Sequence, residues 1–217
     1  MTQCRLRVNG GERLPKQTFF NLPEEKQETL IQAAKNEFSR VPLNKASIAN
    51  IVKNAHIPRG SFYQYFNDKE DAFFYLLELE TKANREKFIS LLTQTEGDVA
   101  ETFIALFKHM LIKFKDQENR SFFKNTFLNM NHKIEHVFTE GIRVTENFSE
   151  ISDIIDTQKL NISHKQEVMY IAKIIGVVTV HNLIQNFAKE IPLDEAVRNY
   201  ELEINLLKRG LYHKEQK

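Results

Sequence analysis

Two short helical patterns joined by a tight break lie between residues 44 and 69. In the first, Ile48, Ile51 and Val52 are spaced three and four residues apart, so they share one helix face. The break falls just before Pro58, which restarts the chain because its fixed φ suits the start of a helix and its missing N–H is not needed there. The pattern predicts two short helices packed at an angle, which is a helix-turn-helix.

The second of these helices, from Arg59 to Phe66, has the size and composition to enter a DNA major groove. Phe62 and Phe66 are four residues apart and are predicted to face inward. Arg59 is the predicted base contact, since its forked guanidinium matches O6 and N7 of guanine; phosphate binding is the alternative. Gln64 could bind adenine or make no contact, and Gly60 would let the backbone come close to a partner.

Periodic apolar positions continue along the chain and predict helices throughout. We expect helices over residues 23–40, 68–92, 98–116, 121–138, 163–189 and 193–212, with short helices and a loop over 140–165. Apolar positions in the last helix alternate steps of four and three, which is typical of a heptad seam. Such a seam either meets a partner helix of another subunit or belongs to the core.

Residues 1–20 are predicted to be a disordered basic arm, because they lack periodicity and contain Gly10 and Gly11. Their basic side chains could reach a minor groove, and a floppy tail is the alternative. A third interpretation makes residues 1–13 an artefact of the assigned start, since Leu14 could be a non-standard start codon. The expected domains are then 1–20, a helix-turn-helix over 21–70 and a helical body over 71–217.

The charge distribution supports this division. The 217 residues are 41% hydrophobic and 27% charged, as in ordinary globular proteins, and the net charge is only +1. Residues 1–69 carry 11 Lys and Arg against 6 Asp and Glu, whereas residues 70–217 carry 19 against 23. A basic front and an acidic back suit a DNA-binding head on a body that DNA does not touch; a chance partition is the alternative.

The single cysteine, Cys4, excludes an internal disulfide and fits a reducing cytoplasm. Residues 1–20 lack the apolar core of a signal peptide. The most apolar run, residues 174–180, is far shorter than the roughly 20 residues of a membrane span. We therefore expect a cytoplasmic protein without a membrane partner.

A dense set of residues between positions 33 and 70 matches one known family pattern. The set is Ala33, Ala34, Phe38, Ile48, Ile51, the run from Ile57 to Phe66, Lys69 and Glu70. With it the chain resembles the DNA-binding domain of the TetR/AcrR family of bacterial repressors. It departs from the family at His56, where a Gly in a left-handed turn is usual, and at Pro58, which replaces a common Ser cap.

The resemblance implies an all-α fold, with an N-terminal three-helix helix-turn-helix domain followed by a helical ligand-binding and dimerisation domain. It implies a homodimer that binds a palindromic double-stranded DNA operator and leaves it when a small apolar or aromatic effector tilts the helix beginning near Asp68. The expected DNA contacts, besides Arg59, Gly60 and Gln64, are Lys45, Ser47, Ser61, Tyr63, Tyr65 and Lys69. The expected four-helix dimer interface contains Ile175, Thr179, Leu183, Tyr200, Ile204 and Leu207.

Candidate chemistry elsewhere is sparse. The chain holds 17 Phe and no Trp, and Phe107, Phe127 and Met130 are candidates to line an effector pocket, with ordinary core as the alternative. His132 and His136 have metal-ligand spacing without a third ligand, so we expect no metal and no cofactor. The chain lacks a nucleophile elbow, a phosphate loop and an HExxH motif, so we expect no enzyme. The alternatives are a helical enzyme using His132 and Glu135, and a helix-turn-helix adaptor that acts through a protein partner.

Overall fold

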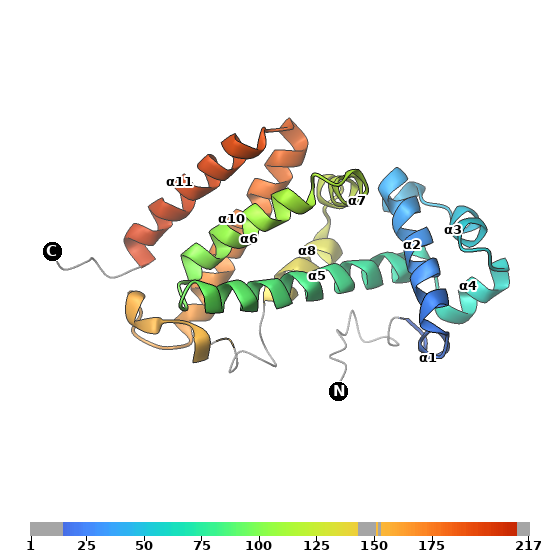
Figure 1. Ribbon diagram of the computed structural model, residues 1–217, viewed down its shortest axis with the longest axis horizontal. Helices are drawn as coiled ribbons and strands as arrows, with labels where there is room; N and C mark the ends of the chain where they lie inside the picture. Colours follow the sequence, from blue (N-terminus) through green and yellow to red (C-terminus); the bar gives the residue numbers. More distant parts are fainter. Residues whose placement is uncertain (1–14, 143–150, 152, 212–217) are drawn as a thin grey trace. The chain divides into compact units, whose positions relative to one another are not determined.

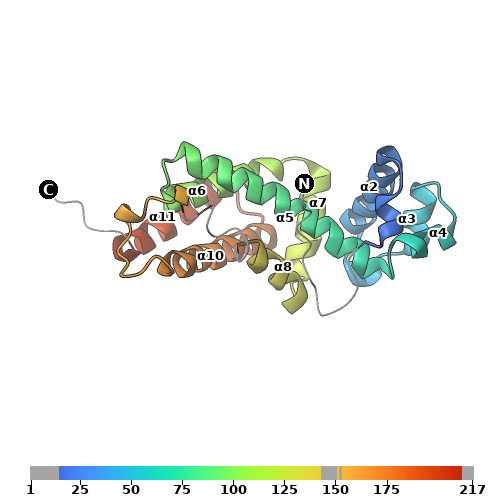
Figure 2. The same ribbon diagram turned by 90° about the horizontal axis from the view of Figure 1, so that it is seen from below.

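Helices account for the regular structure of the described residues, 15–142, 151 and 153–211, in the computed structural model (Figures 1 and 2). The predicted all-α class is thereby confirmed. The helices are α1 (Gln17–Phe20), α2 (Glu24–Arg40), α3 (Ile48–Asn54), α4 (Arg59–Tyr65), α5 (Lys69–Gln94), α6 (Val99–Lys113), α7 (Gln117–Leu128), α8 (His132–Ile142), α10 (Glu167–Lys189) and α11 (Leu193–Leu211). Two short 3-10 turns are η1 (Leu43–Lys45) and η2 (Thr157–Lys159).

The chain forms two compact units, which we call the head and the body. The head comprises Met1–Glu80 and Gln117–Asn129, and the body comprises Thr81–Asp116 and Met130–Lys217. This differs from the expected division at residue 70, because the first part of α5 and the whole of α7 pack with the head. A three-helix head alone has little apolar surface to bury, and the added helices supply it.

Aromatic rings join α2, α5 and α7 into the core of the head. Phe38 on α2 lies 5.2 Å from Phe73 on α5, and Phe73 lies 6.0 Å from Phe122 on α7, measured between ring centroids. All three are at most 3% exposed. Asn125 on α7 also donates 2.9 Å hydrogen bonds to the carbonyls of Phe38 and Ser39, and so caps the C-terminal end of α2.

The expected arm is only partly within the described residues, since residues 1–14 lie outside them. Gln17–Phe20, which we expected to be disordered, form α1. Phe19 is 1% exposed, and its ring lies 5.4 Å from the rings of both Phe66 and Tyr75. This burial anchors α1 to the head and corrects the expected end of the arm.

The single helix predicted over residues 121–138 is two helices, α7 and α8. The break is at residues 129–131, where the Asn131 side chain accepts a 3.0 Å hydrogen bond from the Ile134 N–H. Asparagine is a favoured N-terminal cap, so Asn131 starts a new helix. Met130, a candidate pocket residue, lies in this break and is half-buried.

The body is built from the end of α5 with α6, α8, α10 and α11 (Figure 2). Tyr200 on α11 stacks on Phe107 of α6 at 4.1 Å, and its hydroxyl lies 2.6 Å from that of Thr179 on α10. Gly97, with φ +78°, connects α5 to α6. A Cβ there would lie 2.4 Å from the carbonyl oxygen of Ile154, so only glycine fits where that loop crosses.

The residues of the expected dimer interface lie mostly in the core of the body. Five of the six residues are at most 6% exposed within one chain, and Leu207 is half-buried. The five are Ile175, Thr179, Leu183, Tyr200 and Ile204. A side chain already enclosed by its own subunit has no surface left to bury against a second copy, so burial supports the core alternative for these five residues, and the role of Leu207 stays a prediction.

α10 is long and apolar enough to cross a membrane by length and composition, and it is the one such helix among the described residues. One side of α10 packs against α6, α8 and α11. Core burial of that side explains much of its apolar composition, as in the central helix of many globular domains.

Candidate nucleic-acid interface

The turn between α3 and α4 has the geometry expected from the sequence. The chain leaves α3 through His56, whose φ is +53°, and Ile57 donates a 3.1 Å backbone hydrogen bond back to Val52. Pro58, with φ −61°, precedes the first residue of α4. The left-handed conformation at His56 is the one for which the family usually has Gly, and histidine adopts it at some strain.

α4 separates an apolar side from a polar side. Phe62 and Phe66 are 0% exposed, as predicted. Arg59, Tyr63 and Gln64 are exposed, while Ser61 and Tyr65 are half-buried. The helix therefore presents a guanidinium, an amide and hydroxyls to the outside, the groups that bind base edges and phosphates.

No packing contact within the described part of the chain requires a glycine at position 60. A Cβ built at this position meets no atom within 4 Å, although glycine in a helix costs about 1 kcal/mol relative to alanine. A glycine that no internal neighbour requires is consistent with the close approach of an external partner to the backbone at this position.

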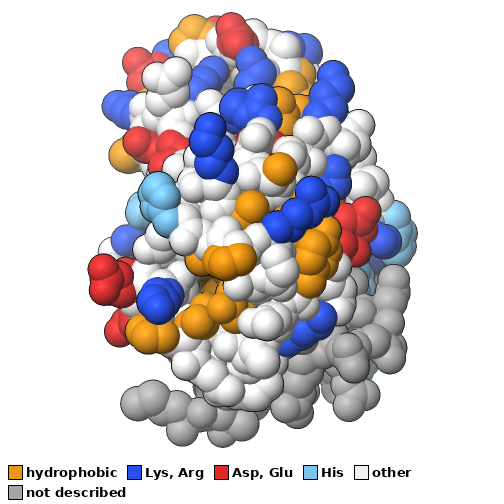
Figure 3. Space-filling model, turned by 90° about the vertical axis from the view of Figure 1, so that its right-hand side faces the viewer, with side chains coloured by type: hydrophobic (Ala, Val, Ile, Leu, Met, Phe, Trp, Pro, Cys, Tyr) orange, Lys and Arg blue, Asp and Glu red, His pale blue; other side chains and the backbone are white. Residues whose placement is uncertain are grey.

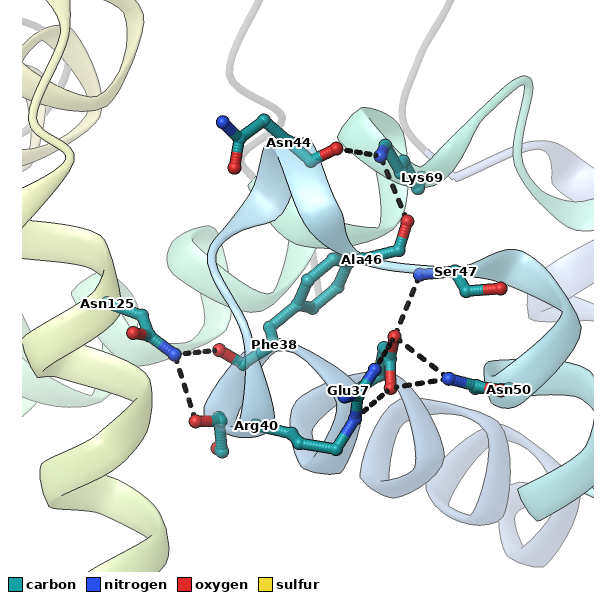
Figure 4. A network of polar contacts seen from close by, with 10 residues as sticks. Glu37, Phe38, Arg40, Asn44, Ala46, Ser47, Asn50, Lys69 and Asn125 are labelled. Carbon is teal, nitrogen blue, oxygen red and sulfur yellow. Dashed lines mark hydrogen bonds and ion pairs between the residues drawn. The ribbon is translucent and has the colours of Figure 1, made fainter.

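A carboxylate that the sequence analysis did not single out holds α3 in place (Figure 4). Glu37 on α2 is 2% exposed, and its Oε1 accepts a 2.8 Å hydrogen bond from the Ser47 N–H, directly before α3. The Asn50 amide on α3 donates to both carboxylate oxygens, at 3.3 and 3.2 Å. Arg40 also donates to both, through its Nε at 3.0 Å and an Nη at 2.8 Å.

Burial alone would raise the pKa of Glu37, but the hydrogen bonds from Arg40, Ser47 and Asn50 and the charge of Arg40 outweigh it and lower the pKa. The carboxylate is therefore ionised at neutral pH. Glu37 was detectable in principle, because it occupies a position on the apolar stripe of α2 between Ala34 and Phe38, and a charge there needs internal partners.

Lys69 has an internal role that the sequence did not show. Its ammonium donates to the carbonyls of Asn44 at 3.0 Å and Ala46 at 2.9 Å, in the loop that leads into α3 (Figure 4). These acceptors account for a cation in the first turn of α5 without a phosphate. An ammonium carries three N–H groups, so two carbonyl bonds still permit a phosphate contact. Lys45 is exposed in the same loop.

Figure 3 shows the surface at the α3–α4 end of the head. Lys and Arg side chains spread across the middle of this face, between apolar and uncharged polar ones, and most acidic side chains lie toward its margins. Scattered cations among uncharged polar side chains suit a polyanion whose phosphates flank the base edges.

Phe107 and Phe127, two of the candidate pocket residues, belong to different compact units. Phe107 belongs to the body, where it is 0% exposed and stacks on Tyr200. Phe127 belongs to the head, where it is 1% exposed and stacks on Phe123 at 6.0 Å. Both side chains are core residues of their own units, and their role in a pocket stays a prediction.

Five large apolar side chains on α10 and α11 are strongly exposed, between 45% and 60%. They are Tyr170, Ile174, Val177, Leu202 and Leu206. The first three are spaced four and three residues apart on α10, and the other two are four apart on α11, so each helix carries an apolar stripe outside the core. We call these five residues the outer stripes. Exposed apolar stripes of this kind are candidates for an interaction face.

His132 and His136 lie on α8 with parallel rings whose centroids are 6.3 Å apart. Among the described residues no group of three His, Cys, Asp or Glu side chains converges on one point. The pair alone is a weak metal site.

Comparison with known proteins adds the family context. A family model described as "Bacterial regulatory proteins, tetR family" matches residues 30–76, and one described as "Tetracyclin repressor-like, C-terminal domain" matches residues 98–211. The HTH-type transcriptional repressor NemR of Escherichia coli K12 is 31% identical over 67 residues, which are 31% of this chain and 34% of NemR. The match thus spans about a third of the length of that relative.

Solved structures extend the similarity to most of the chain. Reduced NemR from E. coli has a TM-score of 0.61 at 18% identity, covering 84% of this chain and 96% of NemR. SmeT, the repressor of a Stenotrophomonas maltophilia multidrug efflux pump, has a TM-score of 0.65 at 15% identity, covering 88% and 94%. The SmeT–triclosan complex gives 0.67 at 14%, with the same coverage. At these identities the likeness shows a common fold.

Proposed function

The chain belongs to the TetR family of bacterial regulatory proteins, and we propose that it is a dimeric transcriptional repressor that binds a palindromic DNA operator. The observation that carries the proposal is the exposed polar side of α4, with an open glycine at position 60. Two such helices in a two-fold dimer would enter successive major grooves, about 34–36 Å apart. NemR, which is similar in sequence and fold, and SmeT, which is similar in fold, are both named as repressors. Their similarity favours this role over an adaptor or an enzyme.

Within α4, Arg59 is the proposed base contact, because it is exposed in the first turn of the helix and its fork fits guanine. Gln64 is a second candidate for a base edge. The remaining proposed contacts, which would bind the phosphate backbone and fix the position of the helix on DNA, are Lys45, Ser47, Ser61, Tyr63, Tyr65 and Lys69.

We propose the outer stripes as the dimer interface. Their five apolar side chains would be buried by a second copy in a two-fold, self-complementary contact of four helices. The Asn182 amide of α10 donates a 2.7 Å hydrogen bond to the Glu203 carboxylate of α11, which holds the two helices in fixed register within one chain.

A small apolar or aromatic effector is proposed to release the operator. SmeT, which is similar in fold, forms a complex with the small molecule triclosan. Phe107, Phe127 and Met130 remain candidates for contact with an effector in this chain. An effector acts only through a difference in affinity between two conformations, and a hundredfold difference supplies about 2.7 kcal/mol. The proposed location is the cytoplasm, where DNA is accessible.

The deciding experiment is selection from a pool of random duplex DNA, followed by anisotropy titration of the enriched sequence at fixed salt. An enriched palindrome with half-sites about one helical turn apart is the expected result. Binding that stays weak and equal for all sequences would contradict the proposal and favour the adaptor or enzyme alternative. An operator, once selected, permits a screen of planar aromatic compounds for loss of anisotropy.

A further inference from the structure

The recognition helix α4 is only seven residues long, and a helix of this length is unstable in isolation. Its last four carbonyls have no partner within the helix and need donors from elsewhere. The first of them, on Phe62, accepts a 2.9 Å hydrogen bond from the Phe66 N–H, which closes the final turn. The other three, on residues 63–65, depend on groups outside α4.

All three donors come from one short stretch before α2. The Lys16 ammonium donates to the Tyr63 carbonyl at 2.9 Å, and the Lys16 backbone N–H donates to the Tyr65 carbonyl at 2.9 Å. The hydroxyl of Thr18 donates to the Gln64 carbonyl. Every orphan carbonyl of α4 therefore has a donor. The Lys16 cation also sits at the negative end of the helix dipole, where a positive charge is favourable.

The Phe19 side chain fixes this stretch to the head. Its ring is 1% exposed and lies 6.4 Å from Tyr65 in α4 and 5.4 Å from Phe66, directly after α4. It also lies 5.4 Å from Tyr75 on α5. The donors at residues 16 and 18 are thus held by a buried ring beside them. We call Lys16, Thr18 and Phe19 the N-terminal clamp.

We propose that the N-terminal clamp is a positioning device for DNA recognition, which sets the axis of α4 on the head; this rests on the proposed function. A seven-residue helix is about 10 Å long, so a tilt of about 10° about its C-terminal end moves its first turn by about 2 Å. Binding sites work within about 0.5 Å of their productive geometry. The clamp lies at one end of α4, and the proposed base contact of Arg59 lies at the other.

Two substitutions remove the clamp's hydrogen bonds and leave Phe19 unchanged. Lys16 has φ −63°, which proline adopts, so Lys16→Pro deletes the N–H and the ammonium together. Thr18→Val keeps the side-chain shape and removes the hydroxyl. Thr29→Val is the matched control, because the Thr29 hydroxyl is exposed and donates only along its own helix, to the Glu25 carbonyl at 2.7 Å.

The full-length double variant Lys16→Pro/Thr18→Val is titrated against the selected operator and against unrelated duplex DNA at several salt concentrations. We expect operator affinity to fall at least about tenfold, since three hydrogen bonds that hold α4 are lost and each is worth about two- to tenfold. Affinity for unrelated DNA should change less than about twofold, and Thr29→Val should match the unsubstituted protein. An equal loss on both DNAs, with a salt slope shallower by about one, would make Lys16 a phosphate ligand and overturn the proposal.

Hydrogen exchange of the free, full-length protein supplies a readout that does not need DNA. Amides of residues 59–66 should exchange faster in the double variant, while those of α2 keep their protection. Unchanged exchange in α4, or unchanged operator affinity, would show that the clamp does not fix the helix. If the unsubstituted protein prefers no DNA sequence, the proposed function fails, and the exchange result still decides whether the clamp holds α4.

Discussion

Ile174 and Ile175 are neighbours on α10, and they distinguish its core face from the face that we propose as the dimer interface. Ile175 is 1% exposed within one chain, whereas Ile174 is 45% exposed and belongs to the outer stripes. Both are isoleucines within the same helix, so replacement by alanine changes helix propensity equally at the two positions. Any difference between the two variants therefore reports what covers each side chain.

The two substitutions are expected to change different quantities: Ile175→Ala the free energy of unfolding, and Ile174→Ala the Kd of the dimer. Ile175→Ala should lower the free energy of unfolding by about 2–5 kcal/mol, because it leaves a cavity in the body core. Isoleucine has three more carbons than alanine, worth about 2.4 kcal/mol when fully buried. The 45% of Ile174 left exposed thus corresponds to about 1 kcal/mol per subunit. A two-fold interface counts this twice, which makes the dimer Kd about thirtyfold weaker in Ile174→Ala.

Sedimentation equilibrium over a range of protein concentrations measures the Kd of the dimer. Urea unfolding at a concentration below that Kd measures the subunit alone, so that association does not add to its stability. Ile174→Ala should raise the Kd of the dimer, and Ile175→Ala should lower the free energy of unfolding of the subunit. The reasoning fails if Ile175→Ala weakens association at unchanged subunit stability, or if Ile174→Ala leaves association unchanged.

Four further variants, at three positions, test the head and the body. Arg59→Ala should weaken operator binding about five- to 150-fold at matched salt, with relaxed preference at one base pair, measured by anisotropy; full affinity would exclude the base contact. Glu37→Ala should lower unfolding stability by about 1–3 kcal/mol through the orphaned N–H of Ser47. Because the folded-state pKa of Glu37 is lowered, the stability from its charge is present above the ordinary value of 4.5 and is lost as pH falls below it. Glu37→Gln and the unsubstituted protein should therefore converge in urea unfolding at acid pH, and a constant gap would contradict the assigned ionisation. Tyr200→Phe should cost about 0.5–1.5 kcal/mol, since it removes a buried bond to Thr179; urea unfolding without a shift would argue against that bond.

The helix-turn-helix was predictable because its determinants are local. Apolar residues three and four apart placed Phe62 and Phe66 inside, and Pro58 marked the start of α4. The left-handed turn at His56 followed from the family resemblance. Each of these features depends on neighbours within a few residues, which is the range over which a sequence pattern carries information.

The face of α11 that we propose to meet a partner was not predictable, because the helix is apolar on two sides. Tyr200 and Ile204 are four residues apart, and so are Leu202 and Leu206. Periodicity alone gives both pairs the same status. Only packing against α6 and α10 assigns the first pair to the core and leaves the second exposed.

The contacts that hold the short helices were invisible for another reason. The Lys16 ammonium caps a carbonyl 47 positions later, and Lys69 donates to one 25 positions earlier. Contacts over such separations produce no periodic pattern in the sequence. An exposed-looking lysine or threonine in an aperiodic segment is indistinguishable from a solvated one until the chain has folded.

The same contacts imply that the head's binding geometry depends on residues that need not touch DNA. α3 and α4 have seven residues each, too few to be stable alone. Glu37 holds the start of α3, Lys69 holds the loop before it, and the N-terminal clamp holds the end of α4. Each tether contributes polar groups from outside the two helices. A loss of operator affinity on substituting one of them is therefore no evidence of a DNA contact, unless the salt slope also changes.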